Sequence, residues 1–174
     1  HDTTLCYSNQ ALVAVRAWLE CHYQDIDTLN RAWGNVFWSQ EYRSFSDVGL
    51  PIAVTECNPA QHLAFRRFSS DQVVRFNDAM LAAIKPHGHE SAWFTHNFMG
   101  NFVDFDHFDV MRSLDVASWD SYPLGFLDIS WIDEADKARF RRSGHPDWAS
   151  FHHSLYRAAG SGRFGVLEPP PGPA

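Results

Sequence analysis

Three short apolar segments, each ending in polar side chains and separated from the next by a helical pattern, constrain the fold of this chain most. Alternating strands and helices favour a parallel sheet with right-handed crossovers, in which catalytic groups lie at the carboxyl ends of the strands. We therefore predict an α/β fold, an arc of a (β/α)8 barrel with a carboxylate at its mouth. The segments are residues 93–99, 114–119 and 164–167, and their polar ends are Asn97, Asp120 to Tyr122, and Glu168.

Helical patterns fill most of the remaining chain. Apolar residues recur at one-turn spacing within 8–24, where Ser8 is the expected N-cap, and within 60–85, where Pro86 ends the pattern. Asp27 is predicted to cap a short helix at 28–33 that Gly34 ends. Two more helices are expected at 105–112 and 146–160, and a loop or insertion of mixed character at 124–146, in which the charge run 133–142 is expected to form a solvated helical face.

Composition excludes several classes of function. The net charge is −7 and no basic stripe is present, so we expect no nucleic-acid partner. No stretch of about 18 apolar residues predicts a membrane span. Neither a Gly-x-Gly-x-x-Gly nor a Walker loop occurs, so a nucleotide-binding sheet would lack its phosphate cradle. The 7 Trp and 14 Phe suit either a large aromatic core or the binding of sugar rings.

The three cysteines, Cys6, Cys21 and Cys57, are odd in number and widely spaced. They form neither a disulfide framework nor a Cys-x-x-Cys metal motif, so we predict reduced thiols and no required cofactor. A structural metal that Cys6 shares with residues upstream of the chain is the alternative. His87 and His89 lack a third ligand in sequence and are not expected to bind a metal.

Several ordered motifs together resemble the family 42 glycoside hydrolases, the microbial β-galactosidases. They are Asn-Phe-Met-Gly at 97–100, Ser-Trp-Asp-Ser-Tyr-Pro at 118–123, Val-Leu-Glu at 166–168 and Pro-Gly-Pro at 171–173. Upstream, residues 26–34 and 36–40 add to the likeness, which covers nearly the whole chain. The resemblance implies a (β/α)8 catalytic domain that hydrolyses terminal β-D-galactosides, of lactose or of plant oligosaccharides, with retention.

The resemblance also assigns roles to particular residues. Glu168 corresponds to the nucleophile at the end of the seventh strand. Tyr122 corresponds to a tyrosine that supports the nucleophile or the transition state, with a packing residue at the end of its strand as the alternative. The acid/base Glu of the family follows its fourth strand, and would lie just upstream of His1. We therefore expect residues 1–174 to form part of one barrel domain, from after strand 4 to the end of strand 7, truncated at both ends and inactive alone.

Three further residues are candidates for substrate binding. Asn97 is expected to face the sugar or to orient a catalytic group, with a structural amide as the alternative. Phe98 and Trp119 are expected to line the pocket, with packing in a core as the alternative. Asp120 is predicted to fix the backbone of its own loop, with acid/base work as the alternative. His152 and His153 are expected to be ordinary surface residues, with an approach of one of them to the cleft as the alternative.

Two positions depart from the family pattern. Gly165 stands where the family usually has a bulky aromatic residue, and Pro169 stands where it commonly has Gln. Both departures raise the prospect of an impaired nucleophile and leave a degenerate sugar-binding barrel as an alternative function. An arabinopyranosidase or another β-glycosidase is the other alternative, since the arabinopyranoside differs by only one hydroxymethyl group.

The expected partners and location follow the same resemblance. The substrate would be a small galactoside or oligosaccharide, and the full-length protein a homo-oligomer, a trimer in this family. We expect a cytoplasmic protein, with a signal peptide upstream of His1 as the alternative.

Overall fold

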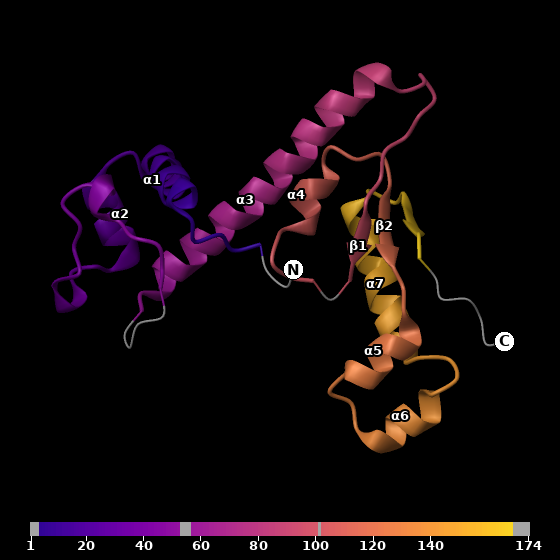
Figure 1. Ribbon diagram of the computed structural model, residues 1–174. Helices are drawn as coiled ribbons and strands as arrows, with labels where there is room; N and C mark the ends of the chain where they lie inside the picture. Colours follow the sequence, from indigo (N-terminus) through magenta and orange to yellow (C-terminus); the bar gives the residue numbers. More distant parts are fainter. Residues whose placement is uncertain (1–3, 53–56, 101, 169–174) are drawn as a thin grey trace. The chain divides into compact units, whose positions relative to one another are not determined.

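The computed structural model describes residues 4–52, 57–100 and 102–168, and the chain divides into two compact units, residues 1–75 and 76–174 (Figure 1). The sequence features at residues 1–3, at Pro169 and at 171–173 lie outside the described residues.

The first unit is helical. Its first helix, α1 (Asn9–Tyr23), begins where Ser8 Oγ accepts a hydrogen bond from the Ala11 N–H at 3.1 Å, which confirms the predicted cap. A loop farther along the unit contains two short 3-10 helices, η1 (Phe37–Ser39) and η2 (Phe45–Asp47). The helices and this loop enclose a core of Val15, Leu19, Leu29, Trp33, Val48, Ala64, Phe65 and Phe68.

The second helix, α2 (Ile26–Trp33), starts two residues earlier than the sequence pattern indicated. Asp25, not Asp27, is the N-cap, and its Oδ1 accepts from the Thr28 N–H at 2.7 Å. Asp27 lies in the first turn, where its negative charge still complements the helix dipole. Gly34 ends the helix with φ = 66°, the left-handed conformation that glycine adopts without steric cost, as predicted.

The long helix α3 (Pro59–Ile84) spans the boundary between the units, and the 3-10 turn η3 (Lys85–His87) that contains Pro86 follows it. The predicted helix at 60–85 is therefore confirmed.

The second unit is built on a parallel sheet of three strands in the order β1-β2-β3, namely β1 (Asn97–Met99), β2 (Ala117–Asp120) and β3 (Phe164–Val166). Asn97 pairs with Ser118, which pairs with Gly165, and this register places the three positions in one row across the sheet. The parallel order and the strand–helix alternation confirm the predicted α/β class.

The first two strands are shorter than their apolar segments, because side chains replace part of the backbone ladder. The Thr95 hydroxyl donates to the Val116 carbonyl at 2.8 Å, and Asp115 Oδ2 accepts from the Phe94 N–H at 2.8 Å. Asn97 consequently begins β1 rather than ending it.

The segment predicted as a loop or insertion at 124–146 contains two helices, α5 (Pro123–Ile129) and α6 (Glu134–Phe140), and α6 lies within the charge run 133–142 that was expected to form a solvated helical face. Pro123 supplies a preset φ for the first turn of α5, and Asp133 caps α6 by accepting from the Asp136 N–H at 2.8 Å. The sequence pattern did not predict α5, because the mixed character of the segment concealed these local signals.

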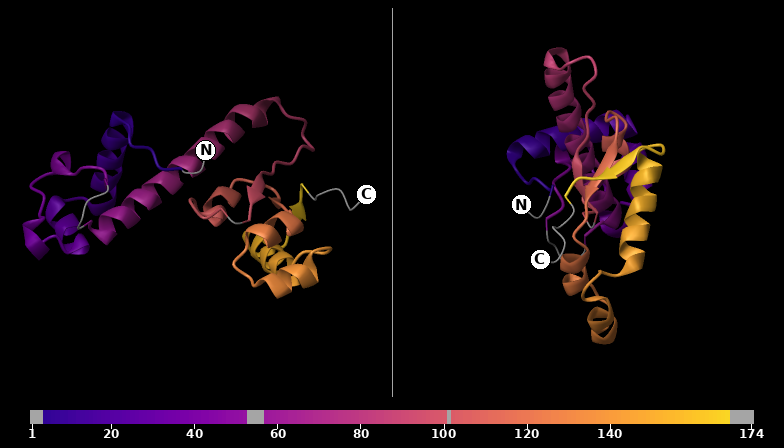
Figure 2. Two further views of the ribbon diagram at one scale, coloured as in Figure 1. Left: turned by 60° about the horizontal axis from the view of Figure 1, so that its bottom comes forward. Right: turned by 90° about the vertical axis from the view of Figure 1, so that its right-hand side faces the viewer.

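Helix α7 (Pro146–Ala159) covers one face of the sheet, as the turned view of Figure 2 shows. Tyr156 of α7 is fully buried and stacks on Trp119 with centroids 5.9 Å apart. The short helix α4 (His107–Met111) completes this layer, and His107 lies 5.0 Å from the ring centroid of Phe98. Burying a side chain such as Phe98 contributes roughly 1.5–3 kcal/mol to stability.

His152 links α7 to the loop that follows β1. Its Nδ1 lies 2.8 Å from the Trp148 carbonyl oxygen and its Nε2 lies 2.9 Å from the Gly100 carbonyl oxygen. With 2% of its surface exposed and its ring stacked on Trp119, His152 is a core residue, so the expectation that it lies on the surface is wrong. His153 is half-buried.

Substituting Gly100 by alanine is expected to destabilise the protein by about 1–3 kcal/mol. A Cβ at this position would lie 2.6 Å from His152 Nε2, and the ring cannot retreat because both nitrogens and one face are engaged. Thermal unfolding of Gly100→Ala should show a lowered Tm. Gly165→Ala is the matched control, because nothing lies within 4 Å of its Cβ position. Equal Tm values for the two variants would contradict the role of Gly100.

Candidate active site

Four polar side chains from the three strands and the loops that follow them meet at one end of the sheet. Asn97 comes from β1, Asp120 from the last position of β2, Tyr122 from the loop after β2, and Glu168 from the loop after β3. Asp120, Tyr122 and Glu168 lie at or after the carboxyl ends of β2 and β3, which a parallel sheet brings to the same end. Asn97 reaches Asp120 and Glu168 from the first position of β1.

Glu168 is exposed, and each of its carboxylate oxygens accepts a hydrogen bond. Asn97 Nδ2 donates to Oε1 at 3.2 Å, and the Tyr122 hydroxyl donates to Oε2. Two donors on one exposed carboxylate fix its rotamer while leaving it open to solvent.

The hydrogen bond to Glu168 is the main cause that raises the pKa of Tyr122, and desolvation and the charges of Glu168 and Asp120 add to it. The Tyr122 phenol therefore stays protonated at neutral pH and remains a donor.

Asp120 differs from its predicted role. Its side chain is 3% exposed, and its Oδ2 accepts from Asn97 Nδ2 at 3.2 Å, on the neighbouring strand rather than in its own loop. Burial, followed by the nearby charge of Glu168, raises the pKa of the Asp120 carboxyl. The sequence signal available for this residue was its place at the end of a strand, between Trp119 and Tyr122.

Phe98 and Trp119 are not part of this cluster. They are 1% and 0% exposed, and their rings pack between the sheet and the helices α4 and α7. Side chains alternate along a strand, so neighbours of Asn97 and Asp120 in sequence point to the opposite face. The expectation that these two rings line a sugar pocket is corrected, and packing in the core, the alternative, describes both.

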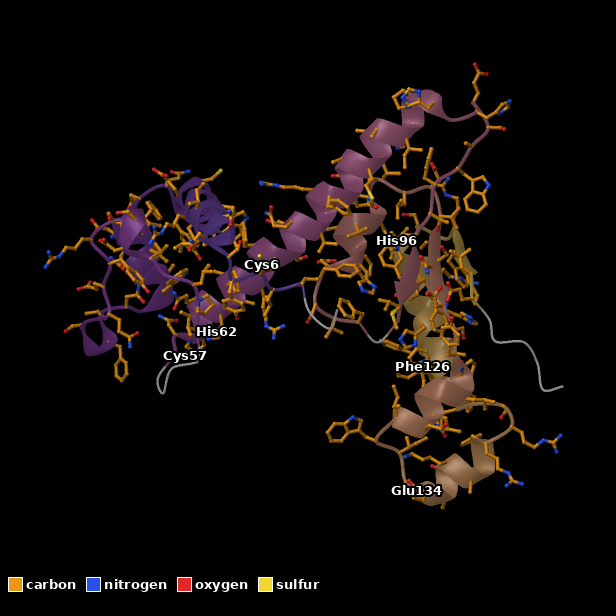
Figure 3. The ribbon with its side chains drawn as sticks, in the orientation of Figure 1. Cys6, Cys57, His62, His96, Phe126 and Glu134 are labelled. Carbon is orange, nitrogen blue, oxygen red and sulfur yellow. The ribbon has the colours of Figure 1, made fainter. Side chains whose placement is uncertain are left out.

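An apolar cavity of about 260 Å³ lies between α5 and α7, apart from the polar cluster. Figure 3 labels Phe126, whose ring contributes to its wall, on α5, and Glu134 on the neighbouring helix α6. None of the four polar residues lines this cavity.

No group of three or more His, Cys, Asp or Glu side chains within residues 4–52, 57–100 and 102–168 is arranged to hold a metal ion. Cys6, labelled in Figure 3, is exposed, and its thiol lies 3.4 Å from the Ser8 hydroxyl. Over the same described residues, no helix has the length and apolar character needed to cross a bilayer.

Comparison with known proteins identifies one family over the whole chain. The model of glycoside hydrolase family 42, described as β-galactosidase, matches residues 1–174. A β-galactosidase of Thermus thermophilus is 51% identical over 174 residues, and one of Halorubrum lacusprofundi is 42% identical. Each alignment covers 99% of this chain, but only 27% and 24% of the relatives, so the chain spans about a quarter of their length.

Solved structures give the same result. A β-galactosidase from the psychrophilic Marinomonas ef1 superposes with a TM-score of 0.91 at 48% identity, covering 96% of this chain and 26% of that one. The Halorubrum lacusprofundi enzyme superposes with a TM-score of 0.88 at 40% identity, covering 99% and 27%. A catalytic mutant of Gan42B, a family 42 β-galactosidase from G. stearothermophilus, superposes with a TM-score of 0.69 at 30% identity, covering 88% of this chain and 22% of that one.

Proposed function

Because this chain belongs to the glycoside hydrolase family 42 β-galactosidases, we propose that its protein hydrolyses terminal non-reducing β-D-galactosyl residues with retention. Glu168 is the nucleophile, which attacks the anomeric carbon and forms a galactosyl-enzyme. A second carboxyl group, about 5–5.5 Å away, protonates the leaving oxygen and then activates water. By the family resemblance this acid/base Glu belongs upstream of His1. The chemistry requires no metal.

The observation that carries this proposal is the pair of hydrogen bonds that hold the Glu168 carboxylate after the end of β3. Tyr122 and Asn97 each donate to a different carboxylate oxygen, and the two hydrogen bonds hold the carboxylate in one orientation for attack on the sugar. When the Glu168 carboxylate bonds to the anomeric carbon, it loses its negative charge. The Tyr122 hydroxyl can then interact with the ring oxygen of the sugar, where charge develops in the transition state.

The sheet supports a further assignment within the barrel. We assign β1, β2 and β3 to strands 5, 6 and 7 of a (β/α)8 barrel, with Glu168 following strand 7. The whole protein would be a cytoplasmic homotrimer acting on small galactosides or oligosaccharides. These statements extend the resemblance and the parallel order of the strands.

The test is the stereochemistry of the reaction. The protein expressed from its complete gene should hydrolyse an aryl β-D-galactoside, and ¹H NMR during the first turnovers should detect the β anomer of galactose before mutarotation produces the α anomer. First formation of the α anomer would contradict the double displacement.

The same assay separates the alternative functions. We expect an aryl α-L-arabinopyranoside to react with a kcat/KM about 10–200-fold lower, the usual range for one missing group in a pocket. A higher value for the arabinoside would make the protein an arabinopyranosidase. A folded protein inactive on both substrates would instead be a degenerate sugar-binding barrel.

A further inference from the structure

The Asn97 amide group connects two carboxylates. Its Nδ2 lies 3.2 Å from Asp120 Oδ2 and 3.2 Å from Glu168 Oε1. An amide NH₂ has two protons, so one N–H serves each carboxylate and the donor capacity of the group is used in full. The same contacts fix the orientation of the amide, because a flipped Asn97 would turn its carbonyl oxygen toward two acceptors.

Asp120 determines this orientation from a buried position. It is 3% exposed, and its other oxygen, Oδ1, is buried without a hydrogen-bond partner in the part of the chain that the structure describes. An ionised carboxylate only accepts hydrogen bonds, so it can receive the Asn97 N–H but can never present a competing donor.

The position of Asp120 has an electrostatic cost. Glu168 lies near Asp120 and carries the same negative charge. The other groups near Asp120 are the imidazole of His96, before β1, and the neutral phenols of Tyr122 and Tyr156. Burial and the charge of Glu168 both disfavour its ionised form. The Asn97 contact is the only hydrogen bond found for its carboxylate among the described residues.

We propose that Asp120 is a positioning residue for Glu168: it holds the Asn97 amide so that the second N–H binds and orients the nucleophile. This inference rests on the proposed function, because it gives Asp120 a part in the same reaction. It differs from a role in the loop of Asp120 itself, since the effect travels across the sheet through one named side chain.

A double-mutant cycle on the protein expressed from its complete gene tests this. Asp120→Ala should lower kcat for an aryl β-D-galactoside roughly tenfold with little change in KM, because Glu168 loses alignment while the sugar contacts remain. In an Asn97→Ala background the same substitution should cost less than about twofold, since the link is already gone. Asp120→Asn should recover most of the loss, because its carbonyl oxygen can still accept from Asn97.

Other outcomes would overturn the inference. Equal losses on Asp120→Ala in both backgrounds, or no recovery in Asp120→Asn, would mean that Asp120 acts on structure alone. If Asp120→Ala does not fold by circular dichroism, the near-isosteric Asp120→Asn carries the test and should keep most of the parent kcat. A loss in Asp120→Asn that is equally large in the Asn97→Ala background would mean that Asp120 acts on structure alone. Asp128→Ala, at an exposed position on α5, is the matched control and should keep the parent kcat.

The parent protein and Glu168→Ala are measured in the same assay. An inactive parent, or an active Glu168→Ala, would refute the proposed function itself. An active parent with an inactive Glu168→Ala, together with additive effects of Asp120 and Asn97, would refute only the role of Asp120.

Discussion

Replacing Glu168 by alanine is expected to lower kcat for an aryl β-D-galactoside by roughly 10⁴-fold or more, because the bond to the anomeric carbon can no longer form. The fold should persist, since Glu168 is exposed and its carboxylate accepts hydrogen bonds from Asn97 and Tyr122 at the surface. Steady-state kinetics with matched circular dichroism spectra measure both effects.

Added azide distinguishes a nucleophile from any other essential carboxylate. In Glu168→Ala a small anion can enter the vacated space and attack the anomeric carbon from the face that Glu168 used. A single displacement inverts the configuration, so the expected product is the α-galactosyl azide, identified by NMR. Rescue that gives the β azide would instead indicate that the acid/base residue had been removed.

Glu134→Ala is the matched control for this experiment. Glu134 lies on α6 with 89% of its side chain exposed, and it forms an ion pair with Lys137 of the same helix. Its replacement should leave kcat at the parent value, with no response to azide. An active Glu168→Ala variant would remove Glu168 from the mechanism.

Replacing Tyr122 by phenylalanine should lower kcat/KM for the same substrate roughly ten- to hundredfold, the usual effect of losing one hydrogen bond to a charged group. The substitution removes the hydroxyl that donates to Glu168 Oε2, while the ring keeps its edge contact with Phe126 at 6.5 Å. Since the bond to Glu168 raises the pKa of Tyr122, the phenol donates throughout the neutral range, and the loss should be similar from pH 6 to 8, about the range of ordinary assays.

Tyr7→Phe provides the comparison, because Tyr7 is 53% exposed and its ring packs on Phe65. Both residues belong to the first unit, whereas Tyr122 belongs to the second. It should keep the parent kcat/KM. A Tyr122→Phe variant with undiminished kcat/KM would show that Tyr122 is a packing residue at the end of its strand, the alternative given above.

Much of the fold could be predicted because its signals are local. Ser8 and Gly34 bound helices through contacts within one turn, and Pro86 stands at the end of α3 for the same reason. The three apolar segments gave three parallel strands, because alternation with helices leaves a parallel sheet as the usual solution. Errors arose where two local signals competed, as between Asp25 and Asp27.

The candidate site could be predicted from the sequence only in part. Glu168, Tyr122 and Asn97 could be singled out from their motifs, but the direction of each side chain could not. Phe98 and Trp119 lie in the same motifs and point to the helices, because strand alternation is decided by which face the core covers. The role of Asp120 was missed because its partner lies on another strand.

The sequence by itself therefore determined the elements, their order and the carboxylate at the end of the third strand. Only the tertiary structure decided which groups meet it. Asn97 and Tyr122 are 71 and 46 residues from Glu168, and Asp120 is 23 residues from Asn97. Contacts over such separations depend on the register and twist of the sheet, which are properties of strands packed together and not of any one segment.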